Sequence, residues 1–261
     1  MAQIAFQRIA IVGAGNVAWH LAPTLQQAGC EIVQVVSLTQ ENAQALANQI
    51  GAQTISRLRD LDPSLDLVLV AVKDDALALV ASEIPQNLAV AHTSGSIPLD
   101  IFPHQNRGVF YPLQTFSKDR KLDWKNIPIC IEASNKAVED SLLALAQKMS
   151  DQVHLLNSEK RAKLHVAAVF ACNFTNHLLG LSSDLLREES LDLHLLDALI
   201  TETVQKALKH GAHGMQTGPA VRKDSKVMVQ HLEQLKPYPH LENIYTILSN
   251  SIIRTKNGEE L

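Results

Sequence analysis

Several features are scarce in this sequence of 261 residues, and each scarcity argues against a class of protein. Cysteine occurs only at Cys30, Cys130 and Cys172, without the paired spacing of disulfide frameworks or zinc sites, so we expect reduced thiols in a cytoplasmic protein. The net charge is −4 and no basic cluster alternates with aromatic residues, which argues against nucleic acid and anionic membranes as partners. We find neither an apolar run of the roughly 18 residues that span a bilayer nor a signal-peptide pattern.

Apolar segments typical of buried strands alternate with helical patterns through the first part of the chain. The expected strands are residues 7–13, 31–38, 66–72, 87–93, 108–113, 127–133 and 152–156, and the expected helices are 19–29, 41–51 and 135–150. This alternation predicts an α/β domain with a doubly wound, mostly parallel sheet and helices on both faces. From residue 158 the pattern is almost entirely helical. We therefore expect two domains, residues 1–157 and an all-helical domain of residues 158–261.

The sequence GAGNVA at residues 13–18 follows the first strand and opens the first helix. Gly13 permits a tight turn, Gly15 lets the backbone approach a pyrophosphate, and Ala18 allows close helix–strand packing. The helix N-terminus offers free N–H groups to the phosphates. The pattern predicts a Rossmann dinucleotide site in which Ala14, Asn16 and Val17 share the contacts.

The residues after the second strand bear on the choice of dinucleotide. NAD sites usually place an Asp or Glu there, whereas this chain has Ser37 and Thr39. Hydroxyl groups can donate to a 2′-phosphate, and the missing carboxylate removes repulsion, so NADP is favoured over NAD. No arginine lies in this stretch, but Arg57 or Arg59 would contribute if the fold brings them close.

Two further polar segments follow strands at the same expected edge of the sheet. HTSGS, residues 92–96, places Thr93 beside the expected nicotinamide, with Ser94 and Ser96 available for a substrate carbonyl or carboxylate. A polar turn without a binding role is the alternative. YPLQTFS, residues 111–117, adds other polar groups at this edge.

The segment HVAAVFACNFTNHL, residues 165–178, has the composition of a buried helix but contains strong hydrogen-bonding groups. At about 100° per residue, His165, Asn173 and Asn176 fall within about 80° of one another on one face. Such a face suits either contacts with another helix or a ligand. His165 can supply a proton at neutral pH, Asn173 can orient a substrate, and Asn176 can bind it. Structural roles for all three remain the alternative.

TGPAVRKD, residues 217–224, predicts another helix start, with Pro219 at the first helical position. Arg222 can bind a substrate carboxylate or phosphate, or it can be a solvated surface residue. The glycine-rich stretch before it contains His210 and His213 without a nearby carboxylate or cysteine, so we predict no metal site.

Taken in order, GAGNVAWHLA, HTSGS, YPLQTFS, HVAAVFACNFTNHL and TGPAVRKD resemble the Rossmann-like proteins with a DUF2520 C-terminal domain. That family is similar to the pyrroline-5-carboxylate reductases, prephenate dehydrogenases and β-hydroxyacid dehydrogenases. The resemblance implies a helical domain like the C-terminal domain of 6-phosphogluconate dehydrogenase, which often dimerises. AVKDD is similar to the AVKP turn of the reductases, which implies cofactor contacts from Val72 and Lys73. The Lys-x-x-x-Asn pair of the β-hydroxyacid dehydrogenases is missing, because Lys163 is followed four residues later by Ala167.

The sequence therefore predicts an NADP-dependent oxidoreductase that transfers a hydride between NADP(H) and a small carbonyl, imine or hydroxy acid. The small-molecule substrate stays unidentified, and a homodimer is expected from the resemblance. A non-catalytic NADP(H)-binding sensor or regulatory protein is one alternative, and a lyase or isomerase with a tightly held cofactor is another. The short-chain dehydrogenases are disfavoured because no Tyr-x-x-x-Lys motif follows the middle strands.

Overall fold

The structure is a computed structural model that describes residues 6–258. The chain forms two compact units, of which the first ends at Val169 and the second begins at Phe170. The division expected from sequence lies after residue 157, immediately before the long helix that begins at Ser158. In the structure the opening residues of that helix belong with the first unit.

An eight-stranded sheet forms the centre of the first unit, in the strand order β3-β2-β1-β4-β5-β6-β7-β8. The strands are β1 (Arg8–Val12), β2 (Glu31–Val36), β3 (Gln53–Thr54), β4 (Leu67–Val70), β5 (Val90–His92), β6 (Arg107–Pro112), β7 (Ile129–Ala133) and β8 (Val153–Leu155). All neighbouring strands are parallel except β6 and β7. The strand order reverses between β1 and β4, which is where doubly wound sheets bind ligands. The expected mostly parallel Rossmann sheet is confirmed; the two-residue strand β3 was not expected.

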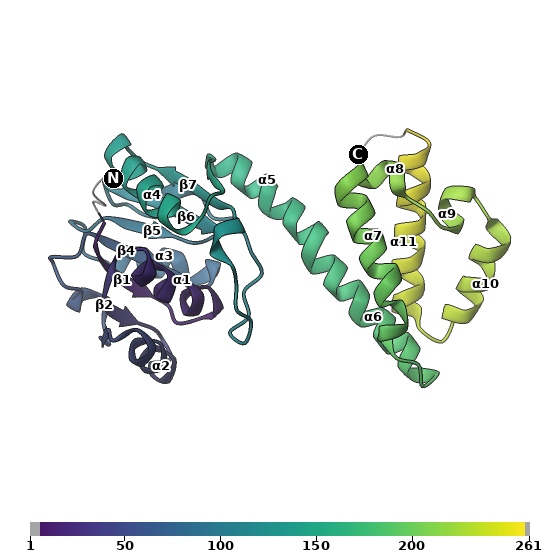
Figure 1. The fold of residues 1–261 in the computed structure, drawn as a ribbon, viewed down its shortest axis with the longest axis horizontal. Helices are drawn as coiled ribbons and strands as arrows, with labels where there is room; N and C mark the ends of the chain where they lie inside the picture. Colours follow the sequence, from purple (N-terminus) through teal and green to yellow (C-terminus); the bar gives the residue numbers. More distant parts are fainter. Residues whose placement is uncertain (1–5, 259–261) are drawn as a thin grey trace. The chain divides into compact units, whose positions relative to one another are not determined.

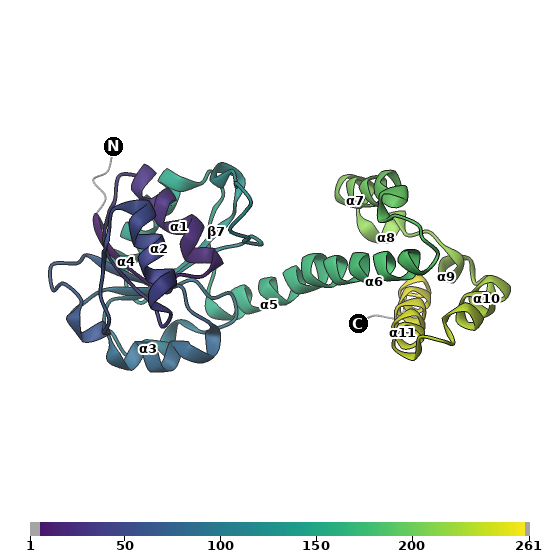
Figure 2. The ribbon, with the colours of Figure 1, turned by 90° about the horizontal axis from the view of Figure 1, so that it is seen from below.

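Helices cover both faces of the sheet, as Figures 1 and 2 show. The helices of the first unit's sheet region are α1 (Asn16–Gln27), α2 (Gln40–Ile50), α3 (Leu77–Glu83) and α4 (Lys136–Met149). Alternate residues of β1 explain the two layers, because Ile9 and Ile11 pack with α1, α2 and α4 while Ala10 and Val12 pack with α3. Two buried cores therefore sandwich the sheet.

Short 3₁₀ helices complete the first unit. They are η1 (Leu58–Asp60), η2 (Asp74–Ala76), η3 (Leu99–Ile101) and η4 (Trp124–Asn126). Two of them, η1 and η2, follow strands β3 and β4 at the edge where the strands end. Neither these turns nor α3 was expected from sequence.

A long helix begins with α5 (Ser158–Ala168), continues through a π-helical segment η5 (Val169–Phe174) and ends with α6 (Thr175–Glu188). A π-helix contains more residues per turn than an α-helix, so each residue advances by a smaller angle. The angles between His165, Asn173 and Asn176 therefore differ from those of a uniform α-helix, and their shared face stays a prediction.

The second unit is helical throughout its described residues and has very little core. After α6 it contains η6 (Leu193–Leu196), α7 (Asp197–His210), α8 (Ala212–Met215), α9 (Pro219–Arg222), α10 (Ser225–Leu235) and α11 (Pro239–Lys256). Within residues 170–258 only Ala220, Leu241 and Ser249 are buried. The expected all-helical C-terminal region is confirmed.

One helix, Ser158–Glu188, is long and apolar enough to cross a membrane, with a mean hydropathy of 1.3 over its most apolar window. The sequence contains no uninterrupted apolar run of that length here, because polar residues such as His165, Asn173 and Asn176 occur within the helix. Core helices of other proteins pass the same test of length and composition, so this property does not establish a membrane segment.

Candidate functional site

The turn after β1 has the geometry of a phosphate-binding loop. Gly13 has a φ of 107°, and a Cβ atom there would lie 2.3 Å from the carbonyl oxygen of Ala71, so only glycine fits. At Gly15 a Cβ atom would meet nothing within 4 Å. Gly15 is also the N-cap of α1, and its helix end has no side-chain cap. The first N–H groups of α1 are therefore available to a phosphate.

A cleft of about 1370 Å³ runs along this edge of the first unit. Its walls come from the segments that follow four neighbouring strands, residues 13–17, 37–39, 71–76 and 93–95. In open α/β sheets, ligands bind outside the carboxyl ends of the strands near the point where the strand order reverses. The glycine turn, the open space before α1 and this cleft together fit a dinucleotide.

Hydroxyl and guanidinium groups share the end of the cleft beyond β2. Ser37 and Thr39 line it, as do Arg57, the N-cap of η1, and Arg59 within η1. The Nε atom of Arg57 lies 2.8 Å from a carboxylate oxygen of Asp60, so its charge is partly compensated. Arg59 is exposed and forms no ion pair with the described residues. The fold thus supplies the cation that the sequence after β2 does not.

The HTSGS loop after β5 is held by its own hydrogen bonds. The Ser94 hydroxyl oxygen accepts the backbone N–H groups of Ser96 and Ile97 at 3.2 and 3.1 Å. The Ser96 hydroxyl donates to the carboxylate of Asp74 on η2. Ser94 lines the cleft, whereas Ser96 does not. The loop is therefore a rigid wall in which Ser94 keeps one hydroxyl hydrogen for a ligand or for Ser96.

His92, the last residue of β5, lies fully buried beneath this loop. Its Nδ1 atom accepts the backbone N–H of Ser94 at 3.2 Å. Burial, together with the positive charge of Arg161, lowers the pKa of His92 from 6.5 to about 4. His92 is consequently a neutral support for the loop.

His165 on α5 and Tyr111 on β6 meet at one end of the cleft. The Tyr111 hydroxyl oxygen lies 3.1 Å from His165 Nδ1, and both side chains line the cleft. Their rings are tilted by 69° with centroids 6.1 Å apart. Burial raises the pKa of Tyr111 to about 12, so its phenol keeps its proton at neutral pH. The cleft therefore contains a hydrogen-bonded tyrosine–histidine pair as well as the glycine turn.

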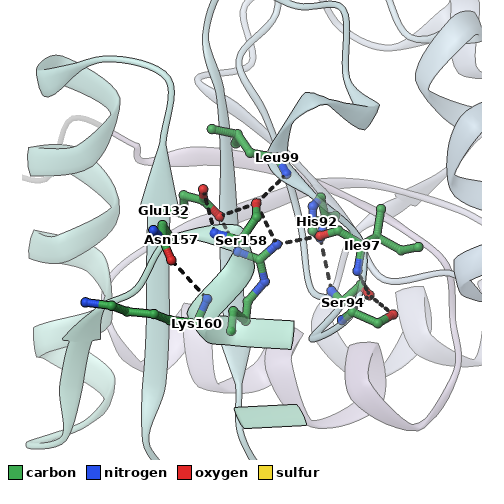
Figure 3. A network of polar contacts seen from close by, with 10 residues as sticks. His92, Ser94, Ile97, Leu99, Glu132, Asn157, Ser158 and Lys160 are labelled. Atoms are coloured by element: carbon green, nitrogen blue, oxygen red, sulfur yellow. Dashed lines mark hydrogen bonds and ion pairs between the residues drawn. The ribbon is translucent and has the colours of Figure 1, made fainter. Parts of the chain in front are cut away.

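A buried ion pair fixes the start of the helix that carries His165 (Figure 3). Arg161 is 1 % exposed and pairs with Glu132 of β7 while also donating to the carbonyl oxygen of Ile97. Ser158 donates its backbone N–H and its hydroxyl to Glu132 at 2.9 and 2.8 Å, and its hydroxyl accepts the N–H of Leu99 at 3.0 Å. This network joins α5, β7 and the segment after the HTSGS loop.

Comparison with known proteins agrees with this architecture. The family model "Domain of unknown function (DUF2520)" matches residues 127–252, and the model "NADP oxidoreductase coenzyme F420-dependent" matches residues 8–93. A crystal structure described as "putative NADP oxidoreductase BF3122 from Bacteroides fragilis" is 39% identical, covers 97% of this chain and 100% of its own, and has a TM-score of 0.88. The chain belongs to the DUF2520 family. The resemblance that the sequence motifs indicated is confirmed.

More distant members of the comparison share the fold. Protein TM1727 from Thermotoga maritima is 22% identical over 96% of this chain and 99% of its own, with a TM-score of 0.72. An imine reductase from Myxococcus stipitatus in complex with NADP⁺ is 15% identical over 96% and 93%, with a TM-score of 0.66. At these identities the likeness concerns the fold alone. No curated protein matches the sequence.

Most of the residues that the sequence singled out lie together in the cleft of this DUF2520 protein. All ten predicted cofactor residues line it: Gly13, Ala14, Gly15, Asn16, Val17, Ser37, Thr39, Val72, Lys73 and Thr93. The predicted catalytic residues Ser94 and His165 line it as well. Asn173, Asn176 and Arg222 belong to the second unit, and their roles stay predictions.

Sequence reasoning missed two contributors to the cleft. Tyr111 was assigned only to a strand end, although its place beside the HTSGS strand was a usable signal, because polar residues that end neighbouring parallel strands meet at one edge. Asp74 lies in the cleft and holds Ser96, and no motif indicated that contact. Both contacts join segments that lie apart in sequence, Tyr111 with His165 and Asp74 with Ser96.

Proposed function

We propose that this protein uses NADPH to reduce the C=N or C=O bond of a small imine, carbonyl compound or oxidised hydroxy acid. The broader class, an NADP-dependent oxidoreductase, is that of its family, and this expectation from sequence is confirmed. The observation that carries the proposal is the meeting of the glycine turn and His165 in one cleft. A cofactor-binding turn and a proton donor are the two groups that such a reduction requires.

Residues of the cleft divide into three binding regions. The uncapped start of α1 and Gly15 receive the pyrophosphate, because free N–H groups and open space occur there together. Ser37, Thr39 and Arg59 receive the 2′-phosphate of NADP, since they combine hydroxyl donors with a cation. Val72, Lys73 and Thr93 then border the nicotinamide.

NADPH, when bound, supplies the hydride. The chain supplies the proton that the substrate's oxygen or nitrogen needs, and we assign its delivery to His165, which lines the cleft. Ser94 offers its hydroxyl hydrogen to the same substrate group. Asn173 is assigned to orient the substrate, and Asn176 and Arg222 to bind it.

A homodimer formed by the second unit completes the proposal. Large apolar side chains are exposed along its helices, among them Phe174, Leu178, Leu185, Leu208 and Ile247. The first three are spaced by four and seven residues on α6 and its N-cap and so form a stripe on one face. Contiguous exposed apolar surface of this kind marks an interaction site. A second copy of the chain also explains the apolar helix 158–188 without a membrane.

Cytoplasmic location is part of the same proposal. Cys30 and Cys130 are buried and free, and Cys172 is exposed and free. Reduced thiols of this kind suit a compartment that keeps cysteines reduced.

Titration of the protein with NADPH and with NADH by calorimetry tests the cofactor site. We expect one-site binding that strongly favours NADPH. Gly15→Val should weaken NADPH binding by about 100-fold, or about 2.7 kcal/mol, because the new side chain occupies the space of the pyrophosphate without touching the protein. Gly180→Ala is the matched control, since it adds a methyl group to equally open space on α6 and should bind normally. Equal binding by both variants would reduce the glycine turn to a structural role.

The catalytic part is tested by the loss of NADPH absorbance with a panel of imines, carbonyl compounds and 2-oxo acids. His165→Gln should abolish turnover of any substrate found while NADPH affinity stays unchanged. Tight NADPH binding without turnover of any panel member would favour the alternative of a sensor that binds NADP(H) without chemistry.

A further inference from the structure

We propose that Tyr111 is a positioning residue for His165: its phenol donates to Nδ1 and keeps the imidazole hydrogen on Nε2, the nitrogen left for the substrate. The Tyr111 oxygen and His165 Nδ1 are 3.1 Å apart. Nε2 has no hydrogen-bond partner among residues 6–258. The catalytic meaning of this pair rests on the proposed function, whereas the position of the hydrogen is a property of the free protein.

The direction of the hydrogen bond follows from the surroundings of the phenol. Tyr111 is buried, and His165 is its only hydrogen-bond partner within the described part of the chain. Burial keeps the phenol protonated by raising its pKa to about 12. If Nδ1 carried the imidazole hydrogen, the phenol would have to accept it and its own O–H would lose its acceptor, which buried hydroxyl groups rarely do.

The position of Gly95 independently supports the contact between Tyr111 and His165. A Cβ atom at Gly95 would lie 2.6 Å from His165 Nδ1 and 2.8 Å from the Tyr111 oxygen. Gly95 is not among the glycines with positive φ, so its backbone conformation does not require glycine. Glycine is required there because the Tyr111 oxygen and His165 Nδ1 occupy the space that a Cβ atom would need. The glycine of the HTSGS loop is therefore explained by the Tyr111–His165 contact.

The arrangement allows a balanced proton transfer. Hydride addition leaves a negative charge on the oxygen or nitrogen of the substrate, which takes the hydrogen from Nε2. Nδ1 takes the phenol hydrogen at the same time, so the imidazole remains neutral and Tyr111 becomes a phenolate. The phenolate then recovers a proton from water. A neutral histidine can act as the donor in this way because a second group resupplies it.

The position of the hydrogen can be measured by ¹⁵N NMR on histidine-labelled protein without substrate or cofactor, at about pH 9, where histidines are neutral. His165→Gln identifies the signals of His165. We expect Nε2 to carry the hydrogen in the wild type. Tyr111→Phe, which removes one oxygen atom, should lower the ratio of the Nε2–H to the Nδ1–H form by about fivefold, the factor that corresponds to one net hydrogen bond.

Two further variants make the measurement specific. Gly95→Ala keeps both residues but separates them, so it should shift the ratio in the same direction as Tyr111→Phe. Tyr245→Phe is the matched control, because Tyr245 and His231 form a similar pair at 3.0 Å in the second unit. It should change the His231 signals and leave His165 unaffected. A hydrogen on Nδ1 in the wild type, or an unchanged ratio in Tyr111→Phe, would overturn the proposal.

Failure of the proposed function would be seen separately. A wild-type protein that binds no NADPH would contradict the oxidoreductase while the hydrogen position stays measurable. Conversely, normal NADPH binding with an unchanged His165 ratio in Tyr111→Phe would contradict only the role of Tyr111.

Discussion

Single residues decide which dinucleotide this cleft accepts. Ser37, Thr39 and Arg59 line its outer end, and Arg59 has no ion-pair partner among the described residues. We predict that Arg59→Ala raises the NADPH dissociation constant by about tenfold, the effect of losing one charge-assisted hydrogen bond, and leaves NADH binding almost unchanged. Calorimetric titration of the variant with each cofactor measures the difference.

Arg57→Ala is the internal comparison for this prediction, because Arg57 is already paired with Asp60 at 2.8 Å. Arg57→Ala should raise the NADPH dissociation constant less than Arg59→Ala does. A parallel loss of NADPH and NADH affinity in Arg59→Ala would mean that the side chain supports the fold of the cleft instead of recognising the 2′-phosphate.

His92 makes stability depend on pH. Its pKa is lowered from 6.5 in the unfolded chain to about 4 in the folded protein, mainly by burial. The unfolded chain therefore binds an extra proton between these values, so the stabilisation is complete above pH 6.5 and is lost as pH falls toward 4. We predict a loss of roughly 2–3 kcal/mol of unfolding free energy from this group between pH 7.5 and 4.5.

His92→Asn should remove that share of the loss, since an amide oxygen can still accept the Ser94 N–H but does not titrate. Urea unfolding followed by tryptophan fluorescence is suitable, because both tryptophans, Trp19 and Trp124, lie in the first unit. His194→Asn, at an exposed position, is the control. An identical acid loss in wild type and His92→Asn would contradict the assignment to His92.

At the scale of elements, the start of α5 depends on the buried pair of Arg161 and Glu132. Removing one partner of a buried pair leaves an uncompensated charge, so Arg161→Met should destabilise the first unit by about 3–5 kcal/mol. Lys163→Met in the same helix breaks an ion pair whose side chains are 77% and 74% exposed, and should cost less than about 0.5 kcal/mol. Urea unfolding of both variants tests this, and equal costs would show that the buried pair does not anchor α5.

The elements themselves were largely predictable, because a buried strand needs only a local apolar run. The expected strands over 31–38 and 127–133 correspond to β2 and β7, and Gly51 ends α2 in the left-handed conformation as its position suggested. Helix α3 was missed because it is only seven residues long. The π-helical segment has no recognisable local pattern, so the uniform helix assumed for His165 and Asn173 could not be corrected from sequence.

The site was predictable where a motif defines it and not where tertiary pairing does. GAGNVA and HTSGS lie in one cleft because strand ends meet at one edge of a parallel sheet. The presence of Arg59 in the cleft depends on where η1 lies, and the contact of Tyr111 with His165 depends on how α5 starts after β8. Neither the position of Arg59 nor the Tyr111–His165 contact can be predicted from residue spacing.

At the scale of the whole molecule, we expect the second unit to need a partner. Only three of its described residues are buried, while a helical unit of this length normally stabilises itself with a continuous core. We predict that sedimentation at micromolar concentration gives a particle of twice the 28.6 kDa of one chain. Leu185→Glu and Leu208→Glu, which place charges on exposed apolar side chains of α6 and α7, should each weaken the dimer by at least about tenfold.

Leu38→Glu provides the control for the dimer, because Leu38 is also an exposed leucine but lies in the cleft of the first unit. It should leave sedimentation unchanged. A monomer that stays folded at micromolar concentration would contradict the dimer, and binding of that monomer to lipid vesicles would assign the apolar helix 158–188 to a membrane surface instead. Loss of the dimer in the Leu185 and Leu208 variants without loss of helix content would place the interface on α6 and α7.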